Sequence, residues 1–490
     1  MLRNIASYLP RESMTALTQV DSSLLGLAGG LKTDNLYWLR KVEHDFNLVI
    51  PADKYAMNWE EVHKFLSVEG TPLTSSNVSL VQLGLDNGYD PSENNNSPIQ
   101  VASRDGHLEV ARLLLQDPRV DPSANDNNAI QLASDGGHTE VVRLLLSDPR
   151  VDPSVDMNNA IQFASDSGHL EVVRLLLSDP RVDPSANDNA PIQWTSGGGY
   201  YEIVVELLRD PRVDPSANDN SAIQLASGGG HYEIVVELLR NQRVDPSANG
   251  NNAIQLASGG GHYEVVRLLL SDPRVDPSAD MNNAIQLASD GGHVDVVVEL
   301  LRDPRVDPSA NDNEAIKLAC LGGYTKIVRL LLQREGVVPS AIAITRACLH
   351  GYYPLVKLLL EDGRVNPSAK SNKAITIACD NGNNKIVELL LADDRVDPSV
   401  ENWKALEDAG KKGYTKIVVL LLERLVQDTS PTTKAVVVTT FTKVCKHGRY
   451  KTARFMLKNH EFEPAVIQLC LNKAKAQEYD ELVELLEQYS

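Results

Sequence analysis

Residues 128–154 read NAIQLASDGGHTEVVRLLLSDPRVDPS, and this stretch decides the fold of the chain. Its short apolar segment, residues 129–134, predicts a first helix. Two glycines follow, and Gly137 can adopt the left-handed backbone conformation that ends a helix without steric cost. The first half of the stretch is therefore one short helix closed by a glycine turn.

The second half predicts another helix and then a loop. In residues 140–146 the apolar residues Val141, Leu144 and Leu145 fall at i, i+3 and i+4, which is one face of a helix. The next segment, residues 147–154, carries two prolines among polar residues, so we expect the chain to leave the helix and run as a connecting loop. The stretch is thus a helix–turn–helix–loop unit.

The unit repeats along the chain. Asp-Pro-Ser recurs every 31 residues, beginning at Asp90, Asp121, Asp152, Asp183, Asp214, Asp245, Asp276 and Asp307. The register continues through residues 338–340, shortens to 28 residues to reach 366–368, and returns to 31 at 397–399. Turn glycines mark twelve full units, at Gly106, Gly137, Gly168, Gly199, Gly230, Gly261, Gly292, Gly323, Gly351, Gly382, Gly413 and Gly448.

Such short helices must stack to be stable. Isolated helices below about 12 to 15 residues are marginal in water, and a repeat buries its apolar face only against its neighbours. We therefore predict an all-α helical solenoid of about twelve 31-residue repeats, with a half unit at 78–89 before them and a closing helix pair at 464–490. The predicted domains are an N-terminal helical domain (1–70), the repeats (71–426), a linker insert (427–434), and terminal repeats with a cap (435–490).

The unit resembles the ankyrin repeat. The motif Gly-His-x-Glu-Val-Val-x-Leu-Leu-Leu stands at residues 137–146, 168–177 and 261–270. The resemblance implies the helix pair and a protein-binding role. Where the family has Thr-Pro-Leu-His-x-Ala-Ala, this chain has Asn-Ala-Ile-Gln-Leu-Ala-Ser, and where the family has Gly-Ala-Asp-Val-Asn it has Asp-Pro-Arg-Val-Asp-Pro-Ser. The family's β-hairpin finger is therefore in doubt.

Composition excludes several kinds of partner. The net charge of −19 repels phosphate backbones and anionic lipid, so we expect no nucleic acid and no membrane partner. Five cysteines in 490 residues form no disulfide framework, which fits a reducing compartment. The sequence shows no secretion signal and no long apolar run, and we expect a monomer in the cytoplasm or nucleus.

The first seventy residues lack the 31-residue register. Their order of apolar and aromatic residues resembles the F-box, a domain that docks onto a Skp-type adaptor of cullin ubiquitin ligases. The resemblance implies adaptor binding by Leu9, Pro10, Leu17, Val20, Leu24 and Trp38, with the repeats holding the target. An F-box joined to many similar ankyrin units is similar to proteins of large DNA viruses of amoebae, which implies a host cell. The alternative is a plain helical cap on the first repeat, in a scaffold without a ligase role.

Candidate catalytic and metal groups have structural explanations. Six histidines recur at one repeat position and are expected to bond the backbone at the turn: His107, His138, His169, His231, His262 and His293. Three cysteines, Cys320, Cys348 and Cys379, replace the serine of the Ser134 position and are expected to be small buried thiols. No nucleophile stands with a base at a recognisable spacing. We expect no enzyme, no metal and no cofactor.

Departures between the repeats mark the candidate target-binding residues. Three adjacent units place a tyrosine after the turn, Tyr201, Tyr232 and Tyr263, and Trp194 lies in the same region. Aromatic side chains bury a large area for little entropy, which suits a binding surface. Between residues 430 and 476 basic residues prevail, and Lys446 and Arg449 are candidates for contacts with an acidic partner. Packing and a solvated basic face are the alternative explanations.

Overall fold

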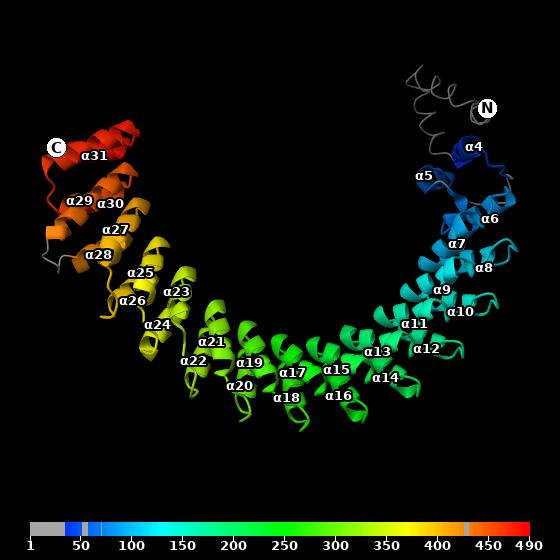
Figure 1. Ribbon diagram of the computed structural model, residues 1–490. Coiled ribbons are helices and arrows are strands. Elements are labelled where there is room, and N and C mark those ends of the chain that lie inside the picture. Colours follow the sequence, from blue (N-terminus) through cyan, green and yellow to red (C-terminus); the bar gives the residue numbers. More distant parts are fainter. Residues whose placement is uncertain (1–34, 51–56, 70, 426–430) are drawn as a thin grey trace, which may run out of the picture. The chain divides into compact units, whose positions relative to one another are not determined.

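The computed structural model describes residues 35–50, 57–69, 71–425 and 431–490 (Figure 1). In these ranges the chain forms α-helices and one 3-10 helix, and no strand. The family's hairpin finger is therefore missing from the described loops. The helices group into two compact units, one holding residues up to Ala226 together with 233–245, the other holding 227–232 and 246–490.

The first unit contains the N-terminal helices and the first five helix pairs. Its helices are α4 (Asn35–Phe46), α5 (Trp59–Glu69), the 3-10 helix η1 (Pro72–Thr74), α6 (Val78–Asp86), α7 (Glu93–Arg104), α8 (Leu108–Leu114), α9 (Ala124–Asp135), α10 (Thr139–Leu146), α11 (Val155–Asp166), α12 (Leu170–Leu177), α13 (Ala186–Gly198), α14 (Tyr201–Arg209), α15 (Ala217–Gly228) and α16 (Tyr232–Arg240). The boundary between the two units falls within the α15–α16 repeat.

The second unit contains the remaining pairs and the C-terminal cap. Its helices are α17 (Ala248–Gly259), α18 (Tyr263–Leu270), α19 (Ala279–Asp290), α20 (Val294–Leu300), α21 (Ala310–Gly322), α22 (Thr325–Leu332), α23 (Ala341–His350), α24 (Tyr353–Asp362), α25 (Ala369–Asp380), α26 (Asn384–Leu391), α27 (Val400–Lys412), α28 (Thr415–Leu425), α29 (Pro431–Lys446), α30 (Tyr450–Asn459), α31 (Pro464–Ala476) and α32 (Asp480–Glu487).

The predicted solenoid is confirmed. Helices α7 to α30 form the twelve expected pairs, with α6 before them and the pair α31–α32 after them. Within each unit the first helices of successive pairs pack side by side, and the second helices form a row beside them (Figure 1). Helix α29 begins at Pro431, so residues 431–434 of the predicted linker insert belong to a helix.

Each repeat contributes the same small set of buried side chains. In the repeat read first these are Ala129, Ile130, Ala133, Val141, Val142 and Leu145. The sequence placed Leu144 on the buried face of α10 in place of Val142, and Leu144 is half-buried. Since successive residues lie about 100° apart around a helix, Val141, Val142 and Leu145 form one face, and this face is turned away from Leu144.

The turn glycine has two structural reasons. Gly137 has φ 70°, as expected from its place after a helix end. A Cβ at this position would also lie 2.5 Å from Nδ1 of His169 in the next repeat. Glycine is thus required both by the backbone and by the side chain that packs on it.

Each regular first helix begins with an unusual left-handed turn. In α9, Asn125, Asp126 and Asn127 have φ of 56°, 53° and 57°. Short polar side chains tolerate this conformation best. An Asx turn lies just before this left-handed turn, where Asp121 Oδ1 accepts a hydrogen bond from the backbone N–H of Ser123 at 2.9 Å.

The described part of the N-terminal domain packs onto the start of the repeats. A hydrophobic cluster joins residues of α4 and α5, including Val42 and Trp59, with Leu80 and Leu83 of α6. Trp38 is half-buried against this cluster, and its ring centroid lies 5.2 Å from that of His63. The other residues assigned to adaptor binding, Leu9, Pro10, Leu17, Val20 and Leu24, lie outside the described residues.

Candidate functional site

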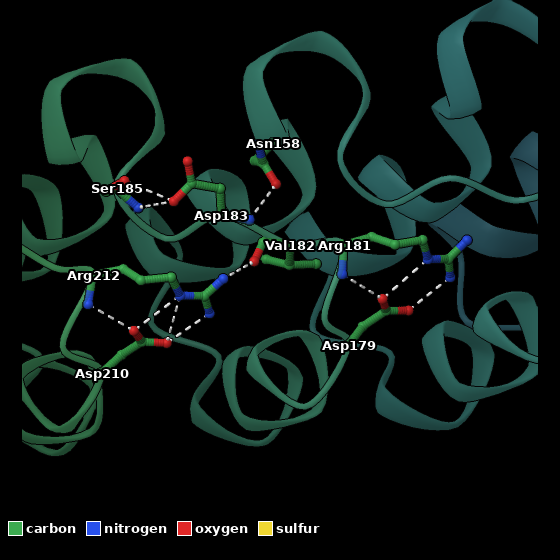
Figure 2. A network of polar contacts seen from close by, with 8 residues as sticks. All are labelled: Asn158, Asp179, Arg181, Val182, Asp183, Ser185, Asp210 and Arg212. Carbon is green, nitrogen blue, oxygen red and sulfur yellow. Dashed lines mark hydrogen bonds and ion pairs between the residues drawn. The ribbon is translucent and has the colours of Figure 1, made fainter.

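An aspartate–arginine pair closes most of the regular loops and ties the loop to the repeat before. Asp179 Oδ1 accepts hydrogen bonds from the backbone N–H and the Nε of Arg181, both at 3.0 Å, and Oδ2 accepts from Nη2 at 2.6 Å. Nη1 of Arg181 donates to the carbonyl of Val151, thirty residues earlier, at 2.7 Å. Figure 2 shows the next copy, in which Arg212 reaches the carbonyl of Val182 at 2.7 Å.

The pairing changes the titration of the carboxylate. The hydrogen bonds from Arg181 hold the pKa of Asp179 below its usual value, although partial burial works in the opposite direction. The bonds from Asp179 likewise raise the pKa of Arg181. We call this bidentate pair, with its bond to the preceding repeat, the Asp–Arg clip.

An asparagine provides a second bond between repeats. Asn158, the last residue of the left-handed turn of α11, is buried, and its Oδ1 accepts from the backbone N–H of Asp183 at 2.8 Å. Asp183 in turn accepts from the N–H and the hydroxyl of Ser185, at 3.0 and 2.6 Å (Figure 2). The left-handed turn therefore aims a side-chain carbonyl at the next loop.

The recurring histidines form a third bond, as the sequence predicts. Their Nε2–H donates to a backbone carbonyl 34 residues earlier, at 2.8 to 2.9 Å, in His138, His169, His262 and His293. Because a carbonyl only accepts, Nε2 carries the proton. Tyr200 takes the histidine position in its repeat. Its ring packs on Gly168, where an added Cβ would lie 2.4 Å from a carbon of the ring. The clip, the asparagine and the histidine thus each form a hydrogen bond between neighbouring repeats.

The first helices expose apolar side chains at one repeat position. In the first unit these are Trp194 and Leu225, exposed by 37% and 40%, and in the second unit Leu256, exposed by 38%. Glycines allow this arrangement, because the Cβ of Leu225 would lie 3.3 Å from a Cβ on Gly197. We call these residues the first-helix row. The sequence interpretation named Trp194 but missed Leu225 and Leu256. The signal for these leucines was present in the sequence, because the preceding repeat has a glycine, such as Gly197, at the position that packs against the leucine.

The three predicted tyrosines have different environments. Tyr201 and Tyr232 begin the second helices α14 and α16 and are exposed by 38% and 37%. Tyr263 is half-buried: its hydroxyl donates to Glu299 at 3.4 Å, and the guanidinium of Arg267 lies 5.8 Å from its ring centroid. Trp194 lies on the first helix of its repeat, so the predicted aromatic residues do not share one helix row.

The basic C-terminal region is partly neutralised. Arg449 takes the histidine position of its repeat, and its Nε donates to the carbonyl of Lys411 at 2.9 Å. Lys446 is exposed at the end of α29. Lys443 pairs with Glu407, which removes one charge from the predicted patch.

The cysteines are buried, as the sequence predicts. Burial raises the pKa of Cys320, Cys348 and Cys379 to about 12, so these thiols stay protonated at neutral pH. Over the described ranges, no three His, Cys, Asp or Glu side chains lie close enough together to hold a metal ion. None of the described helices combines the length and apolar character that crossing a membrane requires.

Comparison with known proteins identifies one family. A family model for ankyrin repeats, in three copies, matches residues 73–156, 117–188, 192–281 and 344–435. These segments cover more than half of the chain. Among curated proteins, none matches the chain.

Proposed function

The chain belongs to the ankyrin-repeat family, whose stacked helix pairs mediate protein–protein interaction, and on this premise we propose that it is a scaffold that binds a target protein through its first helices. The observation that carries this proposal is the first-helix row. Trp194 and Leu225 expose large apolar side chains at a position where solvated helices usually carry polar residues.

The bonds between repeats favour tight binding. The Asp–Arg clips and the buried asparagines hold neighbouring repeats in register, so little conformational entropy is lost when a partner docks. An exposed tryptophan next to a leucine is a typical anchor of a protein interface. The bonded repeats therefore hold Trp194 and Leu225 in position before the partner binds.

Affinity capture with the full chain tests this proposal. We expect a partner captured by the natural sequence to be lost with Trp194→Asp and with Leu225→Asp, because both place a charge in the apolar contact. Tyr201→Ala, on the second helix of the same repeat, is the matched control and leaves capture unchanged. Capture that survives both aspartate variants and fails with Tyr201→Ala would move the surface to the second helices.

We propose in addition that the scaffold is a substrate-recruiting subunit of a cullin ubiquitin ligase. Support comes from the resemblance of residues 1–70 to the F-box, and from the core that α4, α5 and α6 share, which couples that domain to the first repeats. The likeness to proteins of large DNA viruses of amoebae belongs to this proposal, with a host cell's cytoplasm or nucleus as its place and host proteins as targets.

Co-expression of the full chain with a Skp-type adaptor tests the ligase role. We expect a one-to-one complex by size-exclusion chromatography with mass determination, and its loss with Leu9→Asp or Leu17→Asp while circular dichroism shows folded repeats. Folded protein that forms no complex would remove the ligase role and leave a scaffold whose N-terminal helices are a cap.

A further inference from the structure

The repeat of α23 and α24 lacks the left-handed turn of the regular first helices. Helix α21 begins with Asn311, Asp312 and Asn313 at φ of 53°, 54° and 63°. Helix α23, in the 28-residue unit, has ten residues and begins directly after Ser340, which is extended at φ −73° and ψ 154°. The three residues missing from the register are therefore those of the left-handed turn.

The missing residues also remove a side-chain bridge. In regular repeats the first residue of the left-handed turn donates to a glutamine of the first helix before: Asn311 Nδ2 lies 3.2 Å from Gln286 Oε1. In α21 the glutamine position is Lys317, whose ammonium pairs with Asp312 at 2.7 Å and with Glu314 at 3.6 Å. Beside α23 a cavity of about 410 Å³ opens, which is within the range of small ligand sites.

The cavity has apolar walls and exposed apolar edges. Leu318, Leu321, Ile342 and Ala343 line it, and of these Leu321 and Ile342 are exposed by 40% and 45%. Leu321 stands where most other repeats carry aspartate or glycine, as at Asp135, Gly197 and Asp290, and the next repeat again has a leucine there, Leu349, exposed by 47%. Apolar side chains at a solvent-exposed repeat position in two successive repeats indicate a surface that a partner covers.

A single cation stands at this cavity without a carboxylate partner. Arg346 lines the cavity, is exposed, and makes no ion pair with any described residue. It occupies the repeat position of Leu256 and Leu318, so it places a guanidinium within the first-helix row. Lys317, by contrast, pairs with Asp312 and Glu314, two carboxylates that also line the cavity and lie on the α21 side of it. The local surface thus combines an apolar cavity with an anion-accepting group.

We propose that the cavity between α21 and α23 binds a short segment of the partner protein that inserts an aliphatic side chain and places an adjacent carboxylate on Arg346. The proposal rests on the protein-binding function above and specifies the chemistry of the partner. A guanidinium accepts a carboxylate in a planar, bidentate geometry. Because the chain carries a net charge of −19, an acidic segment is accepted where such a group stands and repelled over most of the remaining surface.

Selection of peptides tests the proposal without a known partner. The probe is a library of random twelve-residue peptides displayed on phage and selected on the full chain. We expect the selected peptides to share an aliphatic residue next to Asp or Glu. Their dissociation constants are then measured by fluorescence anisotropy.

Three variants locate the binding site. Arg346→Glu, and an insertion of Asn-Asp-Asn between Ala341 and Ile342 that restores the 31-residue register, should each weaken binding at least tenfold. Arg329→Glu, the same charge reversal at an exposed arginine of the second helix α22, is the matched control and should change binding less than twofold. Circular dichroism confirms that all three fold.

The outcomes separate this proposal from the scaffold proposal. Peptides that bind all three variants equally, or that lose binding only with Arg329→Glu, overturn the cavity but leave a protein-binding surface. Enrichment without an acidic residue overturns the role of Arg346, and no enrichment at all overturns recognition of a short segment. The scaffold proposal is still decided separately by capture with the Trp194 and Leu225 variants.

Discussion

The bond from Asn158 to the next repeat provides the sharpest test of how the solenoid is held together. Asn158 is buried with φ 61°, and its Oδ1 accepts from the backbone N–H of Asp183 at 2.8 Å. Two substitutions separate the roles of its backbone and its side chain. Asn158→Gly keeps the left-handed backbone without steric cost and removes the acceptor, whereas Asn158→Ala removes the acceptor and keeps a Cβ without the short polar side chain that tolerates this backbone.

The magnitudes follow from the two contributions. Leaving the N–H of Asp183 without its acceptor costs about 1 to 3 kcal/mol, and this applies to both variants. In the left-handed conformation alanine costs roughly 1 to 2 kcal/mol more than glycine, so Asn158→Ala should be less stable than Asn158→Gly by about this amount. Since every 1.4 kcal/mol is tenfold, local opening should become roughly five- to 140-fold more frequent with Gly, and about five- to thirtyfold more again with Ala.

Hydrogen exchange measured by mass spectrometry reads this opening locally, which matters because a repeat array need not unfold in one step. The peptide that covers residues 181–185 should exchange faster in the order natural sequence, Asn158→Gly, Asn158→Ala. The equivalent loop around Asp276, which Asn251 holds at 2.7 Å, is the internal control and should not change. Equal exchange of residues 181–185 in all three proteins would refute the reasoning.

Three further predictions concern strain, acid and thiols. Met157 has φ 54° where α17 carries Gly250, so Met157→Gly should raise the local opening free energy by up to about 1 kcal/mol in hydrogen exchange. The reverse change Gly250→Met, whose Cβ would meet no atom within 4 Å, should lower it; opposite signs would contradict the strain argument. The clip carboxylates, such as Asp179 and Asp210, have a lowered pKa in the fold, so their stabilisation is present above about pH 4 and lost as the pH falls through the folded pKa. Circular dichroism should therefore show a lower melting temperature at pH 3 than at pH 6, and an equal or higher one would argue against the clips. Cys320 and Cys348, with pKa raised to about 12, should resist iodoacetamide at pH 8 in the native protein and react after denaturation, whereas rapid native labelling would show that they are not buried.

Much of the fold could be predicted because the repeats carry the same local sequence signals. The period of Asp-Pro-Ser, the turn glycine and the apolar spacing each recur, so the twelve helix pairs follow from local patterns alone. The structural role of His138 and the burial of Cys320 were predicted on the same ground, since a residue repeated at one position is part of the packing.

The bonds that the Asp–Arg clip and the asparagine form between repeats could not be predicted, because they join residues far apart in sequence. Asp-Pro-Arg was interpreted as part of a connecting loop, although Arg181 in fact spans thirty residues to Val151. Three successive left-handed residues are also rare enough that local propensity does not suggest them. The 28-residue unit was visible in the sequence. Only the packing of α21 against α23 shows that the loss of three residues from this unit opens a cavity lined by Ile342 and Arg346.

Site-specific photocrosslinking tests the central claim, that the first helices carry the protein-binding surface, most directly. A benzophenone amino acid is placed at Leu225 in α15, and in a second variant at Glu202 in α14, and each full chain is irradiated in an extract that contains the captured partner. The account predicts a crosslinked product of partner mass from position 225 and none from position 202. Crosslinking from position 202 alone would place the surface on the second helices and contradict the account.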